Sequence, residues 1–406
     1  MNFPFFTAKR LRQADRASFS RTVYQIGVWS IALGLTSMIV AFAVLFGFKA
    51  TVQDKLFSLG AHLRVTKFSV NKSYEETPLS TRTQLVEHYK DLSQIRHLQV
   101  VAHKPGILKT KEDILGVVLK GVGKDYDWAL FGKNLIAGSP VQPSDSGYSS
   151  QIVISQLIAN RLKLKVGDEV VMWFLQNPPR PRKLHIQGVY ETGLEEFDNQ
   201  LVIGDISLIQ RLNNWGKDTA GVYEIYVNDF AQLNAAAQQV ANLMTVDMNL
   251  EKVTDRQRPI FDWLILLDTN IVVFLSLILF VISFNMASIL LVMMMERTPM
   301  IGLLKALGST NWQIRKIFLH QGVAMIARGL LYGNAIGVII CLIQERFKLI
   351  PLDAANYFMN TVPIAWNWWA IVLLNLGTLA LVSAVLLIPT IVITRIQPVK
   401  AIKFTK

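Results

Sequence analysis

The chain has 406 residues, of which 51% are hydrophobic and only 17% are charged. A soluble protein normally carries about 25% charged residues, and here the long apolar runs lie toward the two ends of the chain. Composition therefore indicates membrane spans plus a folded part outside the membrane. The net charge is +12, but no nucleic-acid-binding module is recognisable, so we expect no nucleic-acid partner. A single cysteine, Cys341, excludes an intramolecular disulfide and a thiolate metal site.

The first apolar run, Val23 to Phe46, carries no charge and can cross a hydrocarbon core of ~30 Å. The residues before it are rich in Lys and Arg, which favours a cytoplasmic N-terminal segment at 1–22 and a span at 23–47. A cleaved signal peptide has an apolar core of only about 7–15 residues. We therefore predict that this span is retained.

Three further apolar runs bring the predicted number of spans to four. The loop after the second run holds Arg297, Lys305, Arg315 and Lys316 against Glu296, and the tail is also basic, so both are expected in the cytoplasm. The predicted segments are spans at 263–295, 318–344 and 366–394, a cytoplasmic loop at 296–317, an outer loop at 345–365 and a cytoplasmic tail at 395–406.

Residues 48–262 then lie outside the cytoplasm. Strand-like stretches at 62–65 and 184–189, and helical periodicity at 81–92 and 233–244, predict an α+β domain. The Pro-, Ser- and Gly-rich stretch 138–150 is interpreted as a loop between two lobes. The predicted fold class is thus an integral membrane bundle of four transmembrane helices with a large α+β domain inserted between the first and second.

Motifs of catalysis are missing from the sequence. It contains no G-x-x-x-x-G-K-[ST] phosphate-binding loop, no G-x-S-x-G and no His-Glu-x-x-His. We therefore predict no catalytic residue, no metal site and no cofactor bound by this chain.

The loop after the second span contains a short amphipathic pattern. Apolar residues between Met300 and Leu307 recur at helical spacing, Thr298-Pro299 is a typical helix start and Gly308 a typical stop. From the residues alone, this helix either binds a partner or lies on lipid headgroups.

Polar residues inside predicted spans need a partner or an exit to water. Arg328 is expected to pair with Asp268, to face a protein interface, or to extend toward the membrane surface. Gly329, Gly333 and Gly337 recur every four residues, a spacing that permits close helix packing. In the outer domain, prolines at 178, 179 and 181 argue against strand pairing and predict a stiff loop or hairpin tip.

The sequence resembles the permease subunits of FtsX-like, MacB-type (type VII) ABC transporters, and in particular those of lipoprotein-releasing (Lol) systems. The resemblance is carried by segments in the family's order: Phe6–Leu11, Phe46–Phe48, Gly60–Leu63, Leu157–Asp168, Phe284–Ser288, Met295–Ser309, Gln321-Gly322, Ile388-Pro389 and Pro398–Ile402. Arg328 and the short proline-rich hairpin depart from the family pattern.

The resemblance implies a multi-pass protein of the bacterial inner membrane with a periplasmic domain. It also implies two copies of a cytoplasmic ATPase, which bind ATP and Mg²⁺, and a second permease chain, identical or homologous. The helix in the cytoplasmic loop would be the coupling helix that seats in the ATPase, with these contact residues: Glu296, Arg297, Ile301, Leu304, Lys305, Leu307 and Gly308.

The implied substrate is a lipoprotein leaving the bilayer sideways, for which apolar side chains at the outer ends of the first two spans are candidates: Met38, Phe42, Phe46, Phe48, Phe261, Leu264, Leu267 and Ile271. The proline-rich hairpin, at Pro179, Arg180, Pro181 and Arg182, would dock a periplasmic lipoprotein carrier or be a solvated basic turn. Three alternatives stay open: a signal transducer that activates a cell-wall hydrolase, an exporter of another amphiphile such as a macrolide or peptide, and a stand-alone membrane receptor with no ATPase.

Overall fold

The computed structural model describes residues 19–69, 76–111, 113–144, 147–353, 357 and 359–391. It forms two compact units. The helical unit comprises Met1–Ala50, Trp263–Pro351 and Thr361–Lys406, and the domain comprises Thr51–Asp262 and Leu352–Asn360. The basic segments predicted to flank the first and last spans, at 1–18 and 395–406, lie outside the described residues.

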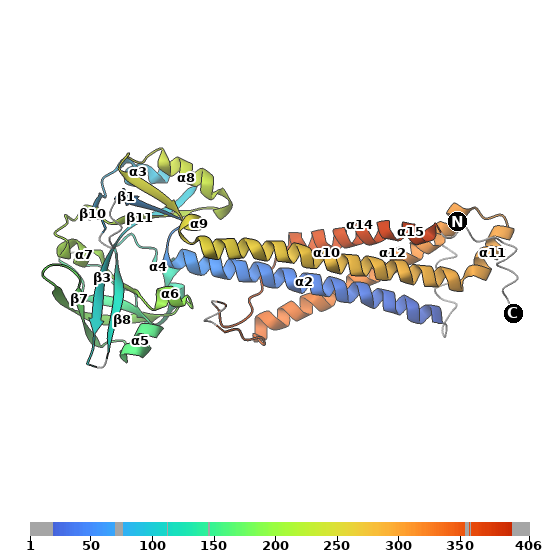
Figure 1. The fold of residues 1–406 in the computed structure, drawn as a ribbon, viewed down its shortest axis with the longest axis horizontal. Coiled ribbons are helices and arrows are strands. Elements are labelled where there is room, and N and C mark those ends of the chain that lie inside the picture. The colour runs from blue at the N-terminus through green and yellow to red at the C-terminus, as the bar shows by residue number, and fades with distance from the viewer. Residues whose placement is uncertain are drawn as a thin grey trace. The chain divides into compact units, whose positions relative to one another are not determined.

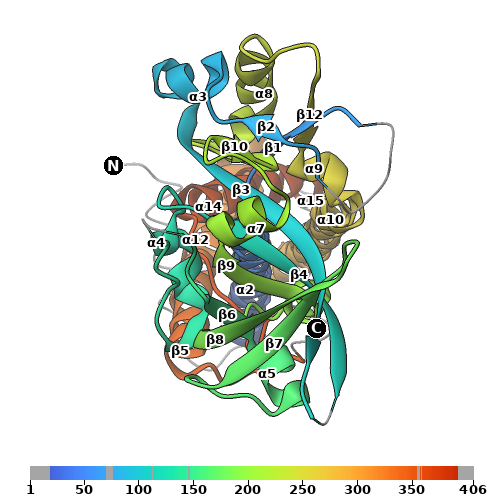
Figure 2. The same ribbon diagram turned by 90° about the vertical axis from the view of Figure 1, so that its left-hand side faces the viewer.

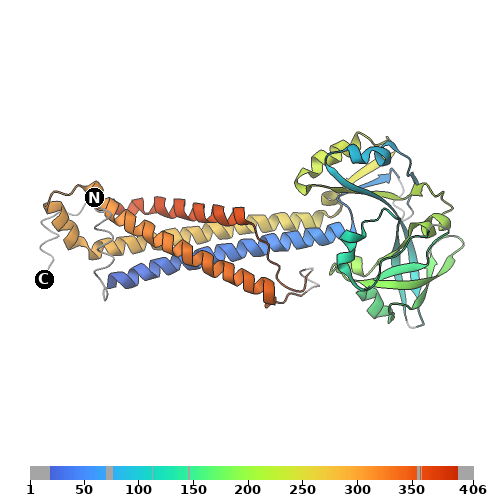
Figure 3. The same ribbon diagram turned by 180° about the vertical axis from the view of Figure 1, so that it is seen from behind.

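Four helices in the described chain are long and apolar enough to cross a membrane. They are α2 (Phe19–Leu59), α10 (Arg258–Glu296), α12 (Asn311–Phe347) and α14 (Trp368–Val385), the last extended by α15 (Leu387–Thr390). Figures 1 and 3 show α2 and α10 running along one another in the helical unit. The predicted set of four apolar helices is confirmed. Helix α2 continues to Leu59 because nothing between Gly47 and Leu59 stops a helix, although the apolar run has ended.

Helix α12 packs closely on α2 through its three spaced glycines. A Cβ atom added at Gly329 would lie 2.6 Å from the Cβ of Ile31, and one at Gly333 would lie 2.8 Å from the carbonyl oxygen of Ala32. The Thr36 hydroxyl also donates to the Gly333 carbonyl at 3.1 Å. The predicted packing role of the glycine series is therefore confirmed.

Side-chain amides and hydroxyls join the helices elsewhere. Asn334 of α12 and Asn375 of α14 donate to each other at 2.7 and 2.9 Å. Asn285 of α10 donates to the hydroxyl of Ser30 on α2 at 3.2 Å. Such bonds hold neighbouring helices together where the surrounding lipid offers no competing partner.

The expected pairing of Arg328 with Asp268 is wrong. Asp268 instead accepts from Lys49 of α2 at 2.6 and 2.8 Å. The Arg328 guanidinium lies over the ring of Tyr24, 5.7 Å from its centroid, and its side chain is exposed. Tyr24 and Lys49 are roughly 37 Å apart along α2 at 1.5 Å per residue, so the two charges lie at opposite ends of the bundle.

The domain is built on a ten-stranded mixed sheet in the order β12-β1-β11-β3-β4-β9-β6-β8-β5, with β7 pairing β3 and β8. The pairs β4–β9 and β6–β8 are parallel and the others antiparallel. The strands are β1 (Leu63–Lys67), β3 (Ile95–Lys109), β4 (Ile114–Val122), β5 (Leu135–Gly138), β6 (Gln151–Ser155), β7 (Glu169–Phe174), β8 (Arg180–Tyr190), β9 (Leu201–Asp205), β11 (Val222–Val227) and β12 (Met248–Lys252), and a separate pair joins β2 (Leu79–Ser80) to β10 (Thr219–Ala220).

Short helices cover the sheet, and side-chain caps fix where they begin. Ser155 accepts from the Ile158 amide at the start of α5, and Asp205 accepts from the Ser207 amide at the start of α7. Figure 2 shows β3 running through the domain, with α3 and α8 toward one end and α5 toward the other. The helices are α3 (Gln84–His88), α4 (Trp128–Phe131), α5 (Gln156–Leu162), α6 (Glu195–Asp198), α7 (Ile206–Leu212), α8 (Leu233–Ala241) and α9 (Val253–Arg256), with 3₁₀ turns at Tyr89–Asp91, Gly132–Asn134 and Phe230–Gln232.

His62 links the end of α2, where the chain enters the domain, to β11 and to α9, near where the chain leaves it. Its Nδ1 accepts from the Val227 amide at 3.1 Å, its carbonyl accepts from the Val253 amide at 2.9 Å, and its ring packs 4.1 Å from that of Phe57. Burial, with a smaller contribution from the Arg96 charge, lowers the pKa of His62 from 6.5 to about 4. The imidazole is therefore neutral and acts as an acceptor at Nδ1.

We expect Gly333→Ala to lower the stability of the detergent-solubilised protein by ~1–3 kcal/mol, because the new methyl group forces α12 away from α2. Thermal unfolding measures this. Gly377→Ala is the matched control, since nothing lies within 4 Å of its added Cβ, and Ala favours a helix over Gly by about 1 kcal/mol. Equal stability of the two variants would contradict the close packing.

The depressed pKa of His62 predicts a loss of stability in mild acid. Between pH 6.5 and about 4 the unfolded chain binds a proton at His62 that the folded chain does not, so stability falls by about 3 kcal/mol across this window. His62→Asn keeps an acceptor near the Nδ1 position and removes the titration. Unfolding midpoints from pH 7 to 4 should therefore fall less steeply in this variant, and identical slopes would refute the assignment.

Candidate functional site

A separate short helix, α11 (Thr298–Ala306), lies between α10 and α12. At its start the Thr298 hydroxyl donates to the Met295 carbonyl at 2.7 Å, and Pro299 occupies the first turn. At its end Gly308 has φ +92°, a conformation that favours glycine, and the Ser309 amide donates to the Leu304 carbonyl at 2.9 Å. The helix begins and ends where the sequence indicates.

The burial of α11 changes which side chains are available to a partner. Ile301 is fully buried in the core of the helical unit, and Leu304 packs partly against that core. Leu303 and Leu307 are 55% and 74% exposed. The expectation that Ile301 forms an exposed anchor is therefore corrected, because the face that carries it packs on the chain's own helices. Leu303, not selected from the sequence, lies one turn before Leu307 on the exposed face.

The polar members of the predicted contact set flank this face. Glu296 and Gly308 are exposed, while Arg297 and Lys305 are half-buried.

After Gly308, Thr310 opens α12 with a capping box: its hydroxyl accepts from the Gln313 amide, and the Gln313 side chain accepts from the Thr310 amide at 2.9 Å. Helix α11 is thus bounded at both ends by defined stops.

The predicted substrate-path residues do not share one surface. Met38 and Leu264 are buried, and Met38 belongs to the core of the helical unit. Phe261 belongs to the domain, where it stacks on Phe230 at 5.7 Å. These three side chains are buried, and their part in a substrate path stays a prediction.

The remaining members of that set are half-buried in the helical unit: Phe42, Phe46, Phe48, Leu267 and Ile271. Phe42 stacks on Phe46 at 5.4 Å, and Phe48 meets Trp263 edge-on at 5.3 Å. The Phe48–Trp263 contact and the Lys49–Asp268 ion pair both join α2 to α10. An apolar region with one ion pair is thus found where these two helices adjoin.

The proline-rich segment is the tip of the β7–β8 hairpin. Strand pairing extends further than predicted, because Phe174 pairs with Arg180 and Trp173 with Pro181. Pro181 is tolerated near the start of its strand, where the ladder is only beginning. The loop is therefore confined to 175–179. Arg180 and Arg182 are half-buried, Pro179 and Pro181 are exposed, and Leu175 and Trp173 add exposed apolar surface.

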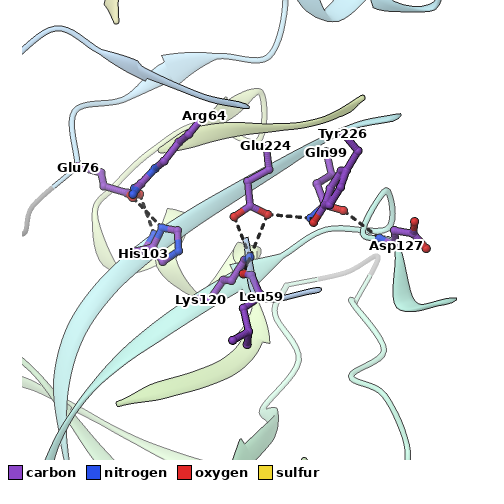
Figure 4. Close-up of polar contacts among 9 residues, drawn as sticks. All are labelled: Leu59, Arg64, Glu76, Gln99, His103, Lys120, Asp127, Glu224 and Tyr226. Atoms are coloured by element: carbon purple, nitrogen blue, oxygen red, sulfur yellow. Dashed lines mark hydrogen bonds and ion pairs between the residues drawn. The ribbon is translucent and has the colours of Figure 1, made fainter. Parts of the chain in front are cut away.

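A buried charged network in the domain was not anticipated (Figure 4). Lys120 of β4 and Glu224 of β11 form an ion pair at 2.8 Å, with side chains only 1% and 6% exposed. Burial raises the pKa of Glu224, but the Lys120 charge and hydrogen bonds outweigh it, and the pKa lies below its ordinary value. The available signal was a lone charge inside each of two apolar strands, VVLKGV and VYEIYV.

A second, half-buried pair joins Glu76, in the segment before β2, to His103 of β3. Glu76 accepts from the His103 amide at 2.7 Å and contacts His103 Nδ1 at 2.8 Å, and Arg64 of β1 donates to it at 3.1 Å. Burial raises the pKa of Glu76, but His103 and Arg64 together lower it below its ordinary value. These contacts fix β1 and β3 and show no geometry of catalysis.

Two family models match the chain. The MacB-like periplasmic core domain matches residues 28–243, more than half of the chain, and the FtsX-like permease C-terminal model matches residues 272–398. The MacB-like model covers most of α2 and most of the sheet. The FtsX-like model covers most of α10 and the helices that follow it.

Curated relatives align along nearly the whole chain. The lipoprotein-releasing system transmembrane protein LolC of Xylella fastidiosa is 22% identical over 97% of both chains, and LolC of Neisseria meningitidis is likewise 22% identical over 97% of both. A solved structure of the periplasmic region of MacB from Actinobacillus actinomycetemcomitans aligns with 49% of this chain and 91% of its own, at 13% identity and a TM-score of 0.35.

The order of elements and the two matches lead to one assignment. A long apolar helix, an α+β domain of the periplasmic core type and three further apolar helices follow one another as the two models require. This chain belongs to the family of FtsX-like, MacB-type ABC transporter permeases.

Proposed function

We propose that this chain is the permease subunit of a lipoprotein-releasing ABC transporter of the bacterial inner membrane. The observation that carries the proposal is the alignment with LolC proteins over 97% of both chains, which leaves no large segment of either without a counterpart. The substrate would be a lipoprotein in the outer leaflet, passed toward the outer membrane.

In this proposal both termini and α11 lie in the cytoplasm and the domain in the periplasm. The charges support this orientation, since Arg297 and Lys305 lie between α10 and α12 and Arg315 lies at the start of α12, against Glu296 at the end of α10. The sequence has no phosphate-binding loop of its own. ATP and Mg²⁺ would therefore bind to two separate ATPase subunits.

Helix α11 is the proposed ATPase contact. Leu303 and Leu307 form its exposed apolar face, and Glu296 and Lys305 would supply polar contacts at the rim. ATP binding would move α11, and with it α10 and α12, because α11 packs into their core through Ile301. A second permease chain, identical or homologous, would complete the transporter.

The substrate would leave the bilayer along the outer parts of α2 and α10, which carry Phe42, Phe46, Phe48 and the Lys49–Asp268 pair. A carrier would dock at the β7–β8 tip, where Arg180 and Arg182 flank exposed apolar surface.

Substituting both exposed leucines of α11 by Asp should separate the ATPase from the permease. Two carboxylates in an apolar contact cost well over the ~1.4 kcal/mol that corresponds to a tenfold loss of affinity. We expect at least tenfold less ATPase to co-purify with the Leu303→Asp, Leu307→Asp protein from detergent extracts. Val246→Asp, in the domain and fully exposed, is the control. Undiminished ATPase in the double variant would refute the docking site.

Release can be measured with the co-purified complex in proteoliposomes that contain a triacylated lipoprotein. We expect lipoprotein to appear in the soluble fraction only when both ATP and a soluble carrier are added. ATP hydrolysis without release would favour the signal transducer. Transport of a macrolide or peptide in place of lipoprotein would favour an exporter.

A further inference from the structure

The end of helix α2 is bound by a side chain from the middle of the sheet. Lys120 Nζ donates to the carbonyl of Leu59, the last residue of α2, at 2.9 Å. The same ammonium donates to both carboxylate oxygens of Glu224, at 2.8 and 2.9 Å. Figure 4 shows Lys120 between these two partners.

These bonds use the full donor capacity of Lys120. An ammonium group has three N–H donors, and three oxygen acceptors lie within 2.9 Å of it. The last carbonyls of a helix have no partner within the helix, and a cation at this end is favoured by the helix dipole. Lys120 therefore satisfies a carbonyl that would otherwise have no helical partner, and Glu224 neutralises the buried charge.

The surrounding side chains hold this arrangement in place. Gln99 donates to Glu224 at 2.8 Å, and its carbonyl oxygen accepts from the Asp127 amide at 2.9 Å. The ring of Tyr126 lies 5.5 Å from Lys120 Nζ. Lys120 thus has little freedom to leave the end of α2.

Stability alone accounts poorly for this pair. Replacing a buried ion pair by apolar residues of similar volume is often neutral or stabilising. Apolar residues would not provide the directional bond to Leu59, and that bond is the specific contribution of Lys120. Thr51–Leu59, the last turns of the α2 helix, belong to the domain, and Ser58 there also accepts from Asn134 at 2.9 Å.

We propose that Lys120, with Glu224 as its counterion, is a positioning residue for substrate release: it fixes the end of α2 to the sheet, so that a displacement of α2 is passed to the domain. This rests on the proposed function, in which ATP binding moves α11 and with it α12. Helix α2 would move with α12 because the two helices pack closely at Gly329 and Gly333. Without the Lys120–Leu59 bond, ATP hydrolysis would continue, but the domain would follow the displacement of α2 less completely.

The decisive variant is Lys120→Met with Glu224→Met, which removes both charges and the Leu59 bond and leaves no unpaired buried charge. We expect the reconstituted complex to hydrolyse ATP at the wild-type rate and to need at least tenfold more ATP per lipoprotein released. Arg82→Met with Asp218→Met is the matched control, because that ion pair of the same domain is 75% and 57% exposed. We expect its ATP-to-release ratio to be unchanged.

Glu224→Gln tests which bond matters. The Gln side chain still accepts from Lys120 and leaves the Leu59 bond intact, so we expect it to retain more coupling than the Met pair. A wild-type ratio in the folded Met pair would overturn the inference, because a merely structural ion pair changes stability and not the ATP used per release.

Hydrogen exchange on the wild-type complex tests the inference without any substitution. The amides of Thr51–Leu59 should stay protected throughout ATP turnover, and their rapid exchange during turnover would overturn the inference. If the wild-type complex hydrolyses ATP but releases no lipoprotein, the proposed function fails. The exchange measurement still reports separately whether the end of α2 stays bound to the sheet.

Discussion

The bilayer allows no unsatisfied backbone groups in its interior, and the rest of this structure depends on that constraint. Helices satisfy their backbone within one segment, so the apolar parts of the chain are helical and the sheet lies entirely in the domain. Each unit then needs its own means of cohesion. Both units have a buried apolar core, and the helical unit adds close glycine contacts and amide pairs between its helices.

Within the helical unit, lipid removes much of the hydrophobic drive for association, so geometry decides which helices adjoin. The glycines of α12 let the backbone of α2 approach, and Asn334 fixes α14 against α12. Helix α11 then packs into the same core through Ile301, which leaves Leu303 and Leu307 outward. The face offered to a partner is thus determined by what the bundle itself buries.

The fold was largely predictable from the sequence because its strongest signals are local. Apolar length predicts the four helices, and Thr298-Pro299 with Gly308 predicts α11. The partners of Asp268 and the burial of Ile301 and Met38 were not predictable, because they depend on which helices adjoin in three dimensions. Pro181 was misjudged because proline disfavours pairing in the middle of a strand and less so near its start. Lys120 and Glu224 are 104 residues apart, so each strand shows a lone charge and neither shows its partner.

The position of β1 in the sheet bears on how the protein is made. β1 follows α2 directly, yet its two neighbours are β11 and β12, which come near the end of the domain sequence. The sheet therefore cannot close around β1 until almost the whole domain has been synthesised, and α10 follows β12 almost directly in the chain. Contacts between such distant segments form slowly, and unpaired strands are prone to aggregation while they wait. During biogenesis, a nascent chain with α2 already inserted would have to keep an open sheet edge protected until α10 follows.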